Sequence, residues 1–344
     1  MSHSPRAEIA VDGAMLVENP ADAGPLARQL EDAGYDGAYT FEGRHDPFLP
    51  LAIAAGATEH LKLQTGIAVA FARNPMLLAN LGYDLQLLSR GRFMLGLGSQ
   101  IRPHIEKRYS ATWSHPAARM REMVLAIRAI WDCWEQGTPL DFRGEYYTHT
   151  LMTPVFNPGP NPHGLAPIYV AAVGPHMTEV AGEVGDGILV HPFNTPRFVA
   201  DQLLPALERG RRKSTHSRDS FSVSCQFIVA SGLDAKEQAD NLALARGQVA
   251  FYASTPAYRP VLDSHGCAEL QPRLNALSKQ GKWQEMSSLL SDELVAEIVI
   301  SGTPEEVGER IRERCAGWCQ RVSPVVYTGS AELRERLVRA IKQT

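Results

Sequence analysis

The chain lacks three features that would each point to a class of protein. It has no apolar run of about 18 residues, so no membrane-spanning helix is expected. It has no excess of basic residues, since its net charge is −4, and this gives no electrostatic sign of nucleic-acid binding. Its amino terminus, Met1-Ser2-His3-Ser4-Pro5, carries no charged segment followed by an apolar one, so no signal peptide is predicted.

Cysteine is also scarce. The five cysteines are odd in number and scattered through 344 residues, which favours free thiols in a reducing compartment and therefore a cytoplasmic protein. Cys315 and Cys319 are four residues apart and would be neighbours on a helix. A metal site needs further ligands close by, so we interpret the pair as two small buried side chains and predict no metal site.

The composition is otherwise that of an ordinary globular protein with a sizeable core, and its most informative stretch runs from Lys62 to Gln100. The stretch begins with an apolar, β-branched segment over 62–69 that suits a buried strand. An amphipathic helix over 76–89 follows, and then a second apolar strand over 93–97. This strand–helix–strand unit has the crossover length that parallel pairing requires.

The alternation of strand and helix continues along the whole chain. The segments that suit strands are 8–15, 36–41, 62–69, 93–97, 167–173, 187–190, 221–230 and 322–327. Alternation predicts a parallel sheet, and eight strands favour a closed α/β barrel, the (β/α)8 or TIM barrel, over an open sheet. Because such a barrel needs only about 250 residues, we expect one domain over 1–344 with insertions near 137–164, where a short hairpin fits, and near 254–291.

Two details of the central stretch point to a ligand. Gly66 interrupts a strand that has no other use for glycine, and glycine there marks a bulge or a backbone that a ligand approaches. The turn Gly98-Ser99-Gln100 lies at the carboxyl end of the next strand, where α/β folds place ligands. Gly96-Leu97-Gly98 could also begin a dinucleotide fingerprint, but no third glycine follows, and this alternative is poor.

Six short motifs stand at the expected strand ends and helix starts. They are Leu63-Gln64-Thr65-Gly66-Ile67-Ala68-Val69, Arg73-Asn74-Pro75, Gly91-Arg92-Phe93-Met94-Leu95-Gly96-Leu97-Gly98, Ala171-Ala172-Val173-Gly174-Pro175, Ala181-Gly182-Glu183-Val184-Gly185-Asp186-Gly187 and Gly302-Thr303-Pro304-Glu305-Glu306-Val307. With these six motifs in this order, the chain resembles the bacterial luciferase-like monooxygenase superfamily. Within that superfamily it resembles the branch that uses coenzyme F420, a deazaflavin. The resemblance covers nearly the whole chain.

The resemblance implies a luciferase-like barrel with the cofactor at the carboxyl ends of the strands. In deazaflavin members a bulge with a non-prolyl cis peptide backs the cofactor ring; by position that bond would be Gly66–Ile67, and an ordinary trans-linked glycine is the alternative. The family's phosphate contacts come from the turn after the fifth strand, where helix-start N–H groups form an anion site, unless this is a plain strand-to-helix turn. The implied cofactor-binding residues are Thr65, Gly66, Ile67, Val69, Gly98, Ser99, Val173, Gly174, Pro175, His176 and Met177.

Proton-handling groups are expected after the second strand, because the deazaflavin carries the hydride while the protein orients it and handles protons. By resemblance Glu42 lies where relatives place an acidic residue near the ring. His45 could transfer protons, since histidine titrates near neutral pH, or it could cap the next helix together with Asp46. We predict Glu42 and His45 as the catalytic residues. Sugar-phosphate-oxidising relatives have histidine in place of Gly43 and glutamate in place of Ile101, which weighs against that activity.

The sequence therefore predicts an oxidoreductase that transfers a hydride between F420 and an unidentified small organic substrate. An FMN-dependent monooxygenase that uses reduced flavin and oxygen is the first alternative, and a flavin-binding barrel without turnover is the second. By resemblance the protein would be a homodimer, and the apolar helix over 47–57 fits either that role or core packing.

Side chains near the expected mouth of the barrel suggest an apolar pocket with cations at its edge. The aromatic ones are Phe41, Phe48, Phe71, Trp113, Tyr146 and Tyr147. Arg102, His104 and Arg108 could meet an anionic substrate or the acidic tail of the cofactor, or lie in a solvated loop.

Overall fold

A computed structural model describes residues 9–215 and 221–343 of the chain. The segment Met1–Pro5, used above to argue against a signal peptide, lies outside the described residues. So does the first residue of the strand predicted over 8–15.

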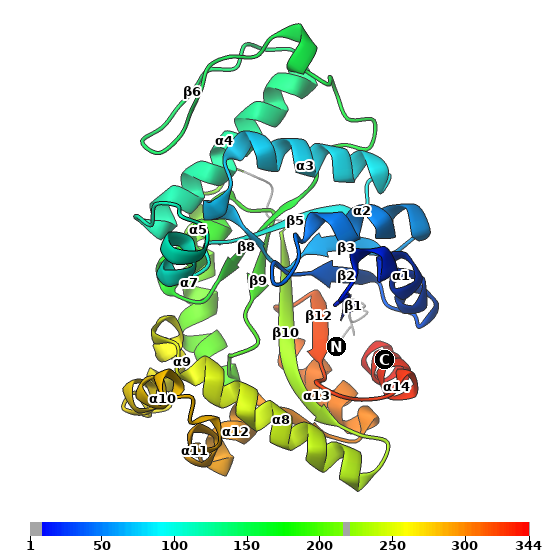
Figure 1. Cartoon of the computed structure of the whole chain (residues 1–344), viewed down its shortest axis with the longest axis vertical. Helices are drawn as coiled ribbons and strands as arrows, with labels where there is room; N and C mark the ends of the chain where they lie inside the picture. The colour runs from blue at the N-terminus through cyan, green and yellow to red at the C-terminus, as the bar shows by residue number, and fades with distance from the viewer. Residues whose placement is uncertain (1–8, 216–220, 344) are drawn as a thin grey trace, which may run out of the picture.

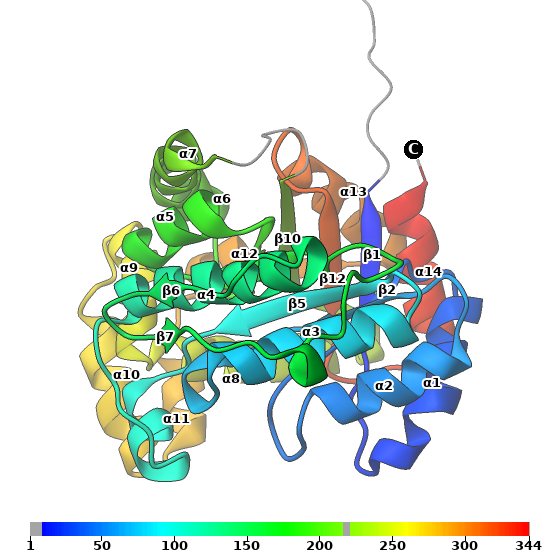
Figure 2. The same cartoon turned by 90° about the horizontal axis from the view of Figure 1, so that it is seen from above.

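Parallel strands form a closed barrel (Figures 1 and 2). Its strands are β1 (Ala10–Ala14), β2 (Gly37–Thr40), β3 (Lys62–Thr65) continued by β4 (Ala68–Val69), β5 (Phe93–Gly98), β8 (Ile168–Ala172), β9 (Gly187–Val190), β10 (Ser222–Ser231) and β12 (Arg321–Val325). Each pairs in parallel with the next in this order, and β12 pairs with β1, which closes the ring. The predicted (β/α)8 TIM barrel is therefore confirmed.

Helices follow the strands and cover the barrel. They are α1 (Ala23–Asp32), α2 (Phe48–Ala57), α3 (Pro75–Leu88), α4 (Pro116–Gln136), α5 (Pro175–Val184), α6 (Pro196–Phe198), α7 (Leu204–Lys213), α8 (Ala235–Ala253), α9 (Arg259–Asp263), α10 (Leu270–Lys279), α11 (Trp283–Ser288), α12 (Asp292–Ile298), α13 (Pro304–Cys315) and α14 (Ala331–Lys342). Their apolar faces and the outward faces of the strands form one continuous core.

Local signals in the sequence explain where several helices begin. Pro75 opens α3 and the Asn74 side chain caps it, while Thr303 and Glu306 form a reciprocal capping box at the start of α13. α4 begins at Pro116 and no earlier, because His115 before it has a left-handed backbone with a φ of 37°.

The chain makes a long excursion between β10 and β11 (Ile300–Gly302) before it returns to the barrel. β11 pairs with the last three residues of β10 and was not predicted, since three residues are too few to show a pattern. The excursion holds α8 and then α9 to α12, where the sequence pattern indicated only an insertion near 254–291. In both views α9, α10 and α11 lie together on one side of the molecule, opposite α14 (Figures 1 and 2).

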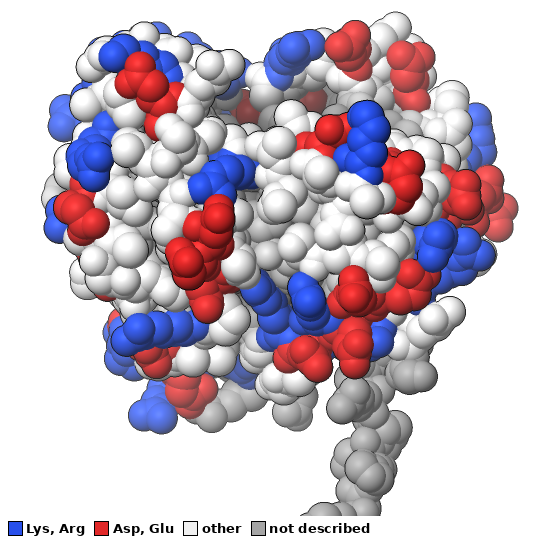
Figure 3. Space-filling model, turned by 90° about the horizontal axis from the view of Figure 1, so that it is seen from below, with Lys and Arg blue, Asp and Glu red and all other residues white. Residues whose placement is uncertain are grey.

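The other predicted insertion, 137–164, contains the expected hairpin. Its strands are β6 (Phe142–Arg143) and β7 (Thr148–His149), which pair antiparallel. Across the face seen in Figure 3, acidic and basic side chains are interspersed among uncharged ones and neither sign forms a continuous field. Among the described residues, no helix is both long enough and apolar enough to cross a membrane.

Candidate active site

The third barrel strand carries a bulge at the mouth of the barrel, the face formed by the carboxyl ends of the strands. Leu63 and Gln64 pair with residues 93 and 94 of β5, and Ala68 and Val69 pair with residues 97 and 98. The chain therefore takes four steps from 64 to 68 where β5 takes three from 94 to 97, which leaves one extra residue in the third strand. The peptide bond at 66–67, inside this bulge, is cis. Both features predicted at this position are confirmed.

Thr65 fills the gap that the bulge leaves in the hydrogen-bond ladder. Its hydroxyl donates to the carbonyl oxygen of Gly96 at 2.7 Å and accepts the N–H of Gly96 at 2.8 Å. A Cβ on Gly96 would lie 1.8 Å from the carbonyl oxygen of Thr65, so only glycine allows the two strands to come this close. Because Thr65 is fully buried and its hydroxyl is engaged, it holds the shape of the bulge and presents no free polar group.

Gly66 and Ile67 are held between two neighbours. A Cβ on Gly66 would lie 3.0 Å from the ring of Tyr39, and a Cβ on Gly98 would lie 2.7 Å from Cδ1 of Ile67. The carbonyl oxygen of Ile67 also accepts the N–H of Glu42 at 3.0 Å. Gly66 and Ile67 are only partly buried, so the bulge remains accessible at the mouth.

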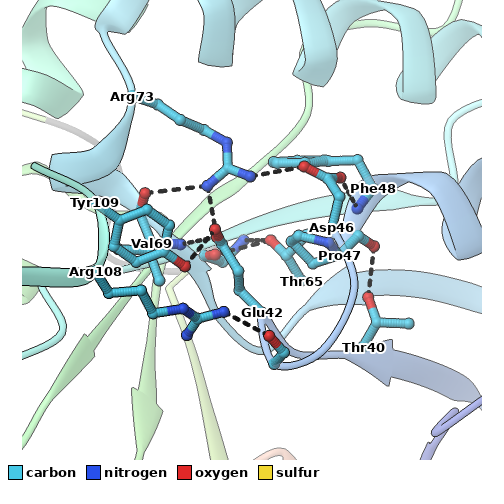
Figure 4. Close-up of polar contacts among 12 residues, drawn as sticks. Thr40, Glu42, Asp46, Pro47, Phe48, Thr65, Val69, Arg73, Arg108 and Tyr109 are labelled. Carbon is cyan, nitrogen blue, oxygen red and sulfur yellow. Dashed lines mark hydrogen bonds and ion pairs between the residues drawn. The ribbon is translucent and has the colours of Figure 1, made fainter. Parts of the chain in front are cut away.

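The carboxylate of Glu42 joins the loops that follow three strands (Figure 4). Its Oε2 accepts the N–H of Val69 at 2.7 Å and Nη1 of Arg73 at 2.5 Å, and its Oε1 accepts the hydroxyl of Tyr109 at 2.8 Å. The side chain of Glu42 is only 7% exposed. Burial, together with the bond to Glu42, raises the pKa of Tyr109, so that hydroxyl remains a donor. Both carboxylate oxygens are thus engaged, and Glu42 fixes the wall around the bulge.

Arg73 extends this network to the start of α2 (Figure 4). Its Nη2 donates to Oδ2 of Asp46 at 2.7 Å, and Oδ1 of Asp46 accepts the N–H of Phe48 at 2.8 Å. Burial lowers the pKa of Arg73, but the bonds to Glu42 and Asp46 outweigh burial and raise it. Asp46 therefore caps α2, as the sequence suggested.

His45 points elsewhere. Its Nε2 lies 2.8 Å from the carbonyl oxygen of Glu18, in the loop after β1. Within the described part of the chain, no hydrogen bond joins His45 to Glu42. The structure thus separates the two residues predicted to be catalytic, with one inside the wall of the mouth and the other at its outer rim.

The loop after β5 is tied to the loop after β2. The hydroxyl of Ser99 donates to the carbonyl oxygen of Gln100 at 3.1 Å, and a short π-helix, η3 (His104–Arg108), follows. Arg108 donates to the carbonyl oxygen of Gly43 at 2.6 Å (Figure 4). Arg102 pairs with Glu106 one helical turn on, so of the three expected cationic residues only Arg108 bridges the two loops.

The first turn of α5 faces open space. Gly174 precedes the helix and has nothing within 4 Å of where a Cβ would stand. Pro175 lacks an N–H, and the next two N–H groups, on His176 and Met177, have no acceptor inside the helix. In the part of the chain that the structure describes, no side chain caps this end of the helix. Val173 is the last residue before the turn and is partly buried.

Sequence reasoning missed an aromatic cluster made of His191, Phe193, Tyr252 and Tyr258. The centroid of the His191 ring lies 4.3 Å from that of Tyr258 and 4.7 Å from that of Tyr252. His191 and Phe193 directly follow β9, and this position after a strand was the signal that could have found them. The two tyrosines come from α8 and the segment after it, and only the tertiary structure brings them to the mouth.

Within the described ranges, the buried polar atoms that have no hydrogen-bond partner include Nε2 of Gln64, on β3, and the hydroxyl of Tyr327, just after β12. Gln64 pairs in register with Tyr39, so the two side chains lie on the same face of the sheet, and the phenol oxygen of Tyr39 accepts the hydroxyl of Ser323 at 3.4 Å. Burial raises the pKa of Tyr39 to about 12, and Tyr252 contributes to this shift.

The aromatic residues predicted near the mouth take different positions. Phe48 and Phe71 are buried in the core, with Arg73 over the ring of Phe48 and Trp113 edge-on to Phe71. The ring of Tyr146 packs near His115, and the hydroxyl of Tyr147 accepts Nε of Arg119 at 2.8 Å. Phe41 is about half exposed. Only Phe41 among these six follows a strand directly and remains free at the rim.

The family description of luciferase-like monooxygenases matches residues 3–318. The chain belongs to this family. An uncharacterized protein of Mycobacterium tuberculosis is 50% identical over 312 residues, which cover 91% of this chain and 92% of the relative. A 5,10-methylenetetrahydromethanopterin reductase of Archaeoglobus fulgidus is 32% identical over 294 residues, 82% of each chain.

A solved structure shares the fold of this luciferase-like chain. The coenzyme F420-dependent tetrahydromethanopterin reductase of Methanopyrus kandleri aligns with a TM-score of 0.76 and 20% identity, and covers 98% of both chains. The similarity predicted from the sequence, to the luciferase-like superfamily and to its F420-dependent branch, is confirmed. Family and relatives indicate an oxidoreductase or monooxygenase.

Proposed function

We propose that this protein is an oxidoreductase that transfers a hydride between coenzyme F420 and a small organic substrate. The observation that carries the proposal is the bulge at Gly66–Ile67, which stands at the mouth of a luciferase-like barrel between Tyr39 and Gly98. Similar proteins of this fold include a reductase whose name states its dependence on coenzyme F420.

The residues around the bulge fit a tricyclic ring. A flat ring needs a backbone wall without protruding side chains, and Gly66 and Gly98 supply one on either side of Ile67. The buried, unpartnered Nε2 of Gln64 offers a donor to a ring carbonyl. The proposed ring contacts are Thr65, Gly66, Ile67, Val69, Gly98 and Ser99. Thr65 and Val69 contribute indirectly, because their hydrogen bonds hold the backbone that faces the ring.

The start of α5 fits the phosphate of the cofactor. N–H groups at a helix N-terminus attract anions, and Gly174 leaves the approach open. The proposed phosphate contacts are Val173, Gly174, Pro175, His176 and Met177.

When bound, the deazaflavin supplies hydride transfer, and the chain supplies position and proton handling. We propose that Glu42 acts by fixing Val69, Arg73 and Tyr109 around the ring. His45 is the proposed proton carrier, because it is an accessible imidazole at the rim. Exchange of each for alanine, Glu42→Ala and His45→Ala, tests these roles, and a variant that retains full turnover removes that residue from the site.

The cofactor assignment is tested by titrating the purified protein with oxidised F420 and, separately, with FMN while cofactor fluorescence is recorded. The proposal expects saturable binding of F420 that is at least about tenfold tighter than that of FMN. If FMN binds more tightly and product forms only with oxygen, the protein is a flavin monooxygenase, the alternative favoured by the family's name. The remaining outcome is that a cofactor binds while no substrate in a broad screen changes the absorbance of that cofactor. This outcome supports the second alternative, a flavin-binding barrel without turnover.

We further propose a homodimer formed through α2 and α3. Apolar side chains on both helices are exposed, with Leu49 and Ile53 one turn apart on α2 and Leu77 and Leu88 on α3. All five cysteines are free thiols, which supports the proposal of a reducing compartment such as the cytoplasm.

A further inference from the structure

The imidazole of His191 is fixed by the turn that follows β9. Its Nδ1 accepts the N–H of Phe193 at 3.1 Å, and its carbonyl oxygen accepts Nδ2 of the buried Asn194 at 2.7 Å. The turn is also fastened to the excursion, because Nε2 of His265 lies 2.8 Å from the hydroxyl of Thr195. The bond from Phe193 therefore sets the orientation of the ring, and the other two bonds hold the turn that carries it.

This geometry decides the tautomer of His191. A backbone N–H can only donate, so the Nδ1 that faces the N–H of Phe193 carries no proton. A neutral imidazole then has its proton on Nε2. The structure describes no acceptor for this Nε2–H, and the residue is only partly buried. Burial in the cluster lowers the pKa of His191 to about 3, so the ring is neutral at ordinary pH.

Among the described residues, the rings that pack against His191 are aromatic and uncharged. The aromatic cluster encloses the ring, with Tyr258 tilted against it at 35° and Tyr252 edge-on at 79°. Phe193 continues the cluster at 6.1 Å and 6.3 Å from the two tyrosine rings. A neutral donor among aromatic faces favours a flat, uncharged ligand with an acceptor oxygen and disfavours an ion.

The aromatic cluster lies near residues that pack against the bulge. Tyr252 lies near enough to Tyr39 and Tyr327 to contribute to the raised pKa of both phenols, for which burial is the main cause. The ring of Tyr39 in turn packs 3.0 Å from where a Cβ on Gly66 would stand. Tyr252 and Tyr39 thus lie between His191 and Gly66.

We propose that Nε2–H of His191 donates a hydrogen bond to the carbonyl oxygen of an uncharged planar substrate, such as an aryl or α,β-unsaturated ketone. The proposal rests on the proposed function, because it names the substrate side of the same site. During reduction the carbonyl carbon would gain the hydride that the reduced deazaflavin supplies, the π electrons would move to oxygen, and that oxygen would take the proton that His45 is proposed to carry. His191 keeps its own proton and stabilises the negative charge that develops on the oxygen.

Two substitutions separate this donor from the structural role of the ring. In His191→Asn the side-chain oxygen can still accept the N–H of Phe193, but no donor reaches the mouth. In His191→Gln the amide extends to where Nε2 stands and restores a donor. Neither change adds charge or bulk to the cluster.

The test uses prodan, an uncharged naphthyl ketone whose emission moves to longer wavelength when its carbonyl accepts a hydrogen bond. It is titrated into the cofactor-free protein, and the affinity for F420 is measured in parallel. We expect prodan to bind about tenfold more weakly to His191→Asn, with blue-shifted emission, while His191→Gln stays within about threefold of the wild type. 2-Acetylnaphthalene should displace the probe, and the anionic naphthalene-2-carboxylate should not.

The inference is overturned if the wild type does not bind prodan, if His191→Asn binds it as the wild type does with the same emission, or if the carboxylate competes equally. The F420 titration separates this failure from that of the proposed function. Unchanged F420 binding in all three proteins leaves the proposed function standing whatever the probe shows, and absence of F420 binding in the wild type refutes it independently.

Discussion

The hydroxyl of Thr65 makes two hydrogen bonds to the backbone of Gly96, one as donor and one as acceptor. Neighbouring strands normally supply such bonds from their own backbones, but the bulge at 65–67 removes that possibility. The hydroxyl of Thr65 thus takes the place of the backbone hydrogen bonds between the third strand and β5 at the bulge, which is the proposed cofactor wall.

Replacing Thr65 by valine keeps the shape of the side chain and removes the hydroxyl. Both backbone groups of Gly96 would then be buried without a partner, and each unpaired group costs about 1–3 kcal/mol. We expect Thr65→Val to lower the free energy of unfolding by about 2–6 kcal/mol, measured by urea denaturation. Thr65→Ser keeps the hydroxyl, so its free energy of unfolding should fall clearly less than that of Thr65→Val. Equal losses in the two variants would show that the methyl group matters and the hydrogen bonds do not.

Adding a methyl group at Gly98 should disturb the wall directly. The new Cβ would lie 2.7 Å from Cδ1 of Ile67, so Ile67 has to move toward the space assigned to the ring. We expect Gly98→Ala to weaken F420 binding by at least about tenfold, measured by fluorescence quenching. Gly56→Ala is the matched control, since no described atom lies within 4 Å of its Cβ position and it is an exposed residue in the last turn of α2. Unaltered F420 affinity in Gly98→Ala would remove this face of the bulge from the site.

The lowered pKa of His191 predicts a loss of stability in acid. Between its usual value of 6.5 and about 3, the unfolded chain binds a proton that the folded chain does not, so the free energy of unfolding falls as pH falls through this window. From pH 7 to pH 5 the wild type should lose up to about 2 kcal/mol more than His191→Asn, in urea denaturation at each pH. If the free energy of unfolding depends on pH in the same way in both proteins, His191 has the same pKa in the folded and the unfolded chain.

The proposed dimer predicts a mass of twice the chain mass of 37.7 kDa in light scattering after gel filtration. Leu49→Glu combined with Ile53→Glu places two charges on the exposed apolar face of α2 and should give monomers. Leu244→Glu puts a charge on exposed apolar surface of α8 and should leave the dimer intact. A monomeric wild type, or a dimer that survives both charges, would exclude this interface.

The sequence predicts the barrel because its signals are local and repeated. Apolar strands of similar length alternate with capped helices such as α3 and α13. Each strand–helix repeat on its own predicts a parallel α/β fold, so the repeats reinforce one another. Gly66 could be singled out for a related reason, since glycine has little use inside a strand unless the backbone departs from regular pairing.

The sequence could not show which side chains meet at the mouth. Glu42, Arg73 and Tyr109 come from three separate loops, and their hydrogen bonds depend on the register of the barrel. Tyr252 and Tyr258 belong to an excursion whose path over the barrel leaves no periodic signal. His45 was chosen for its titration range alone, and range does not determine where a side chain points.

A crystal structure of the protein with F420 tests the central claim most directly. The account predicts that the deazaflavin ring lies in van der Waals contact with Gly66 and Ile67, and that its phosphate accepts the N–H groups of His176 and Met177. A ring bound away from the bulge, or a phosphate held elsewhere while the start of α5 remains free, would contradict it.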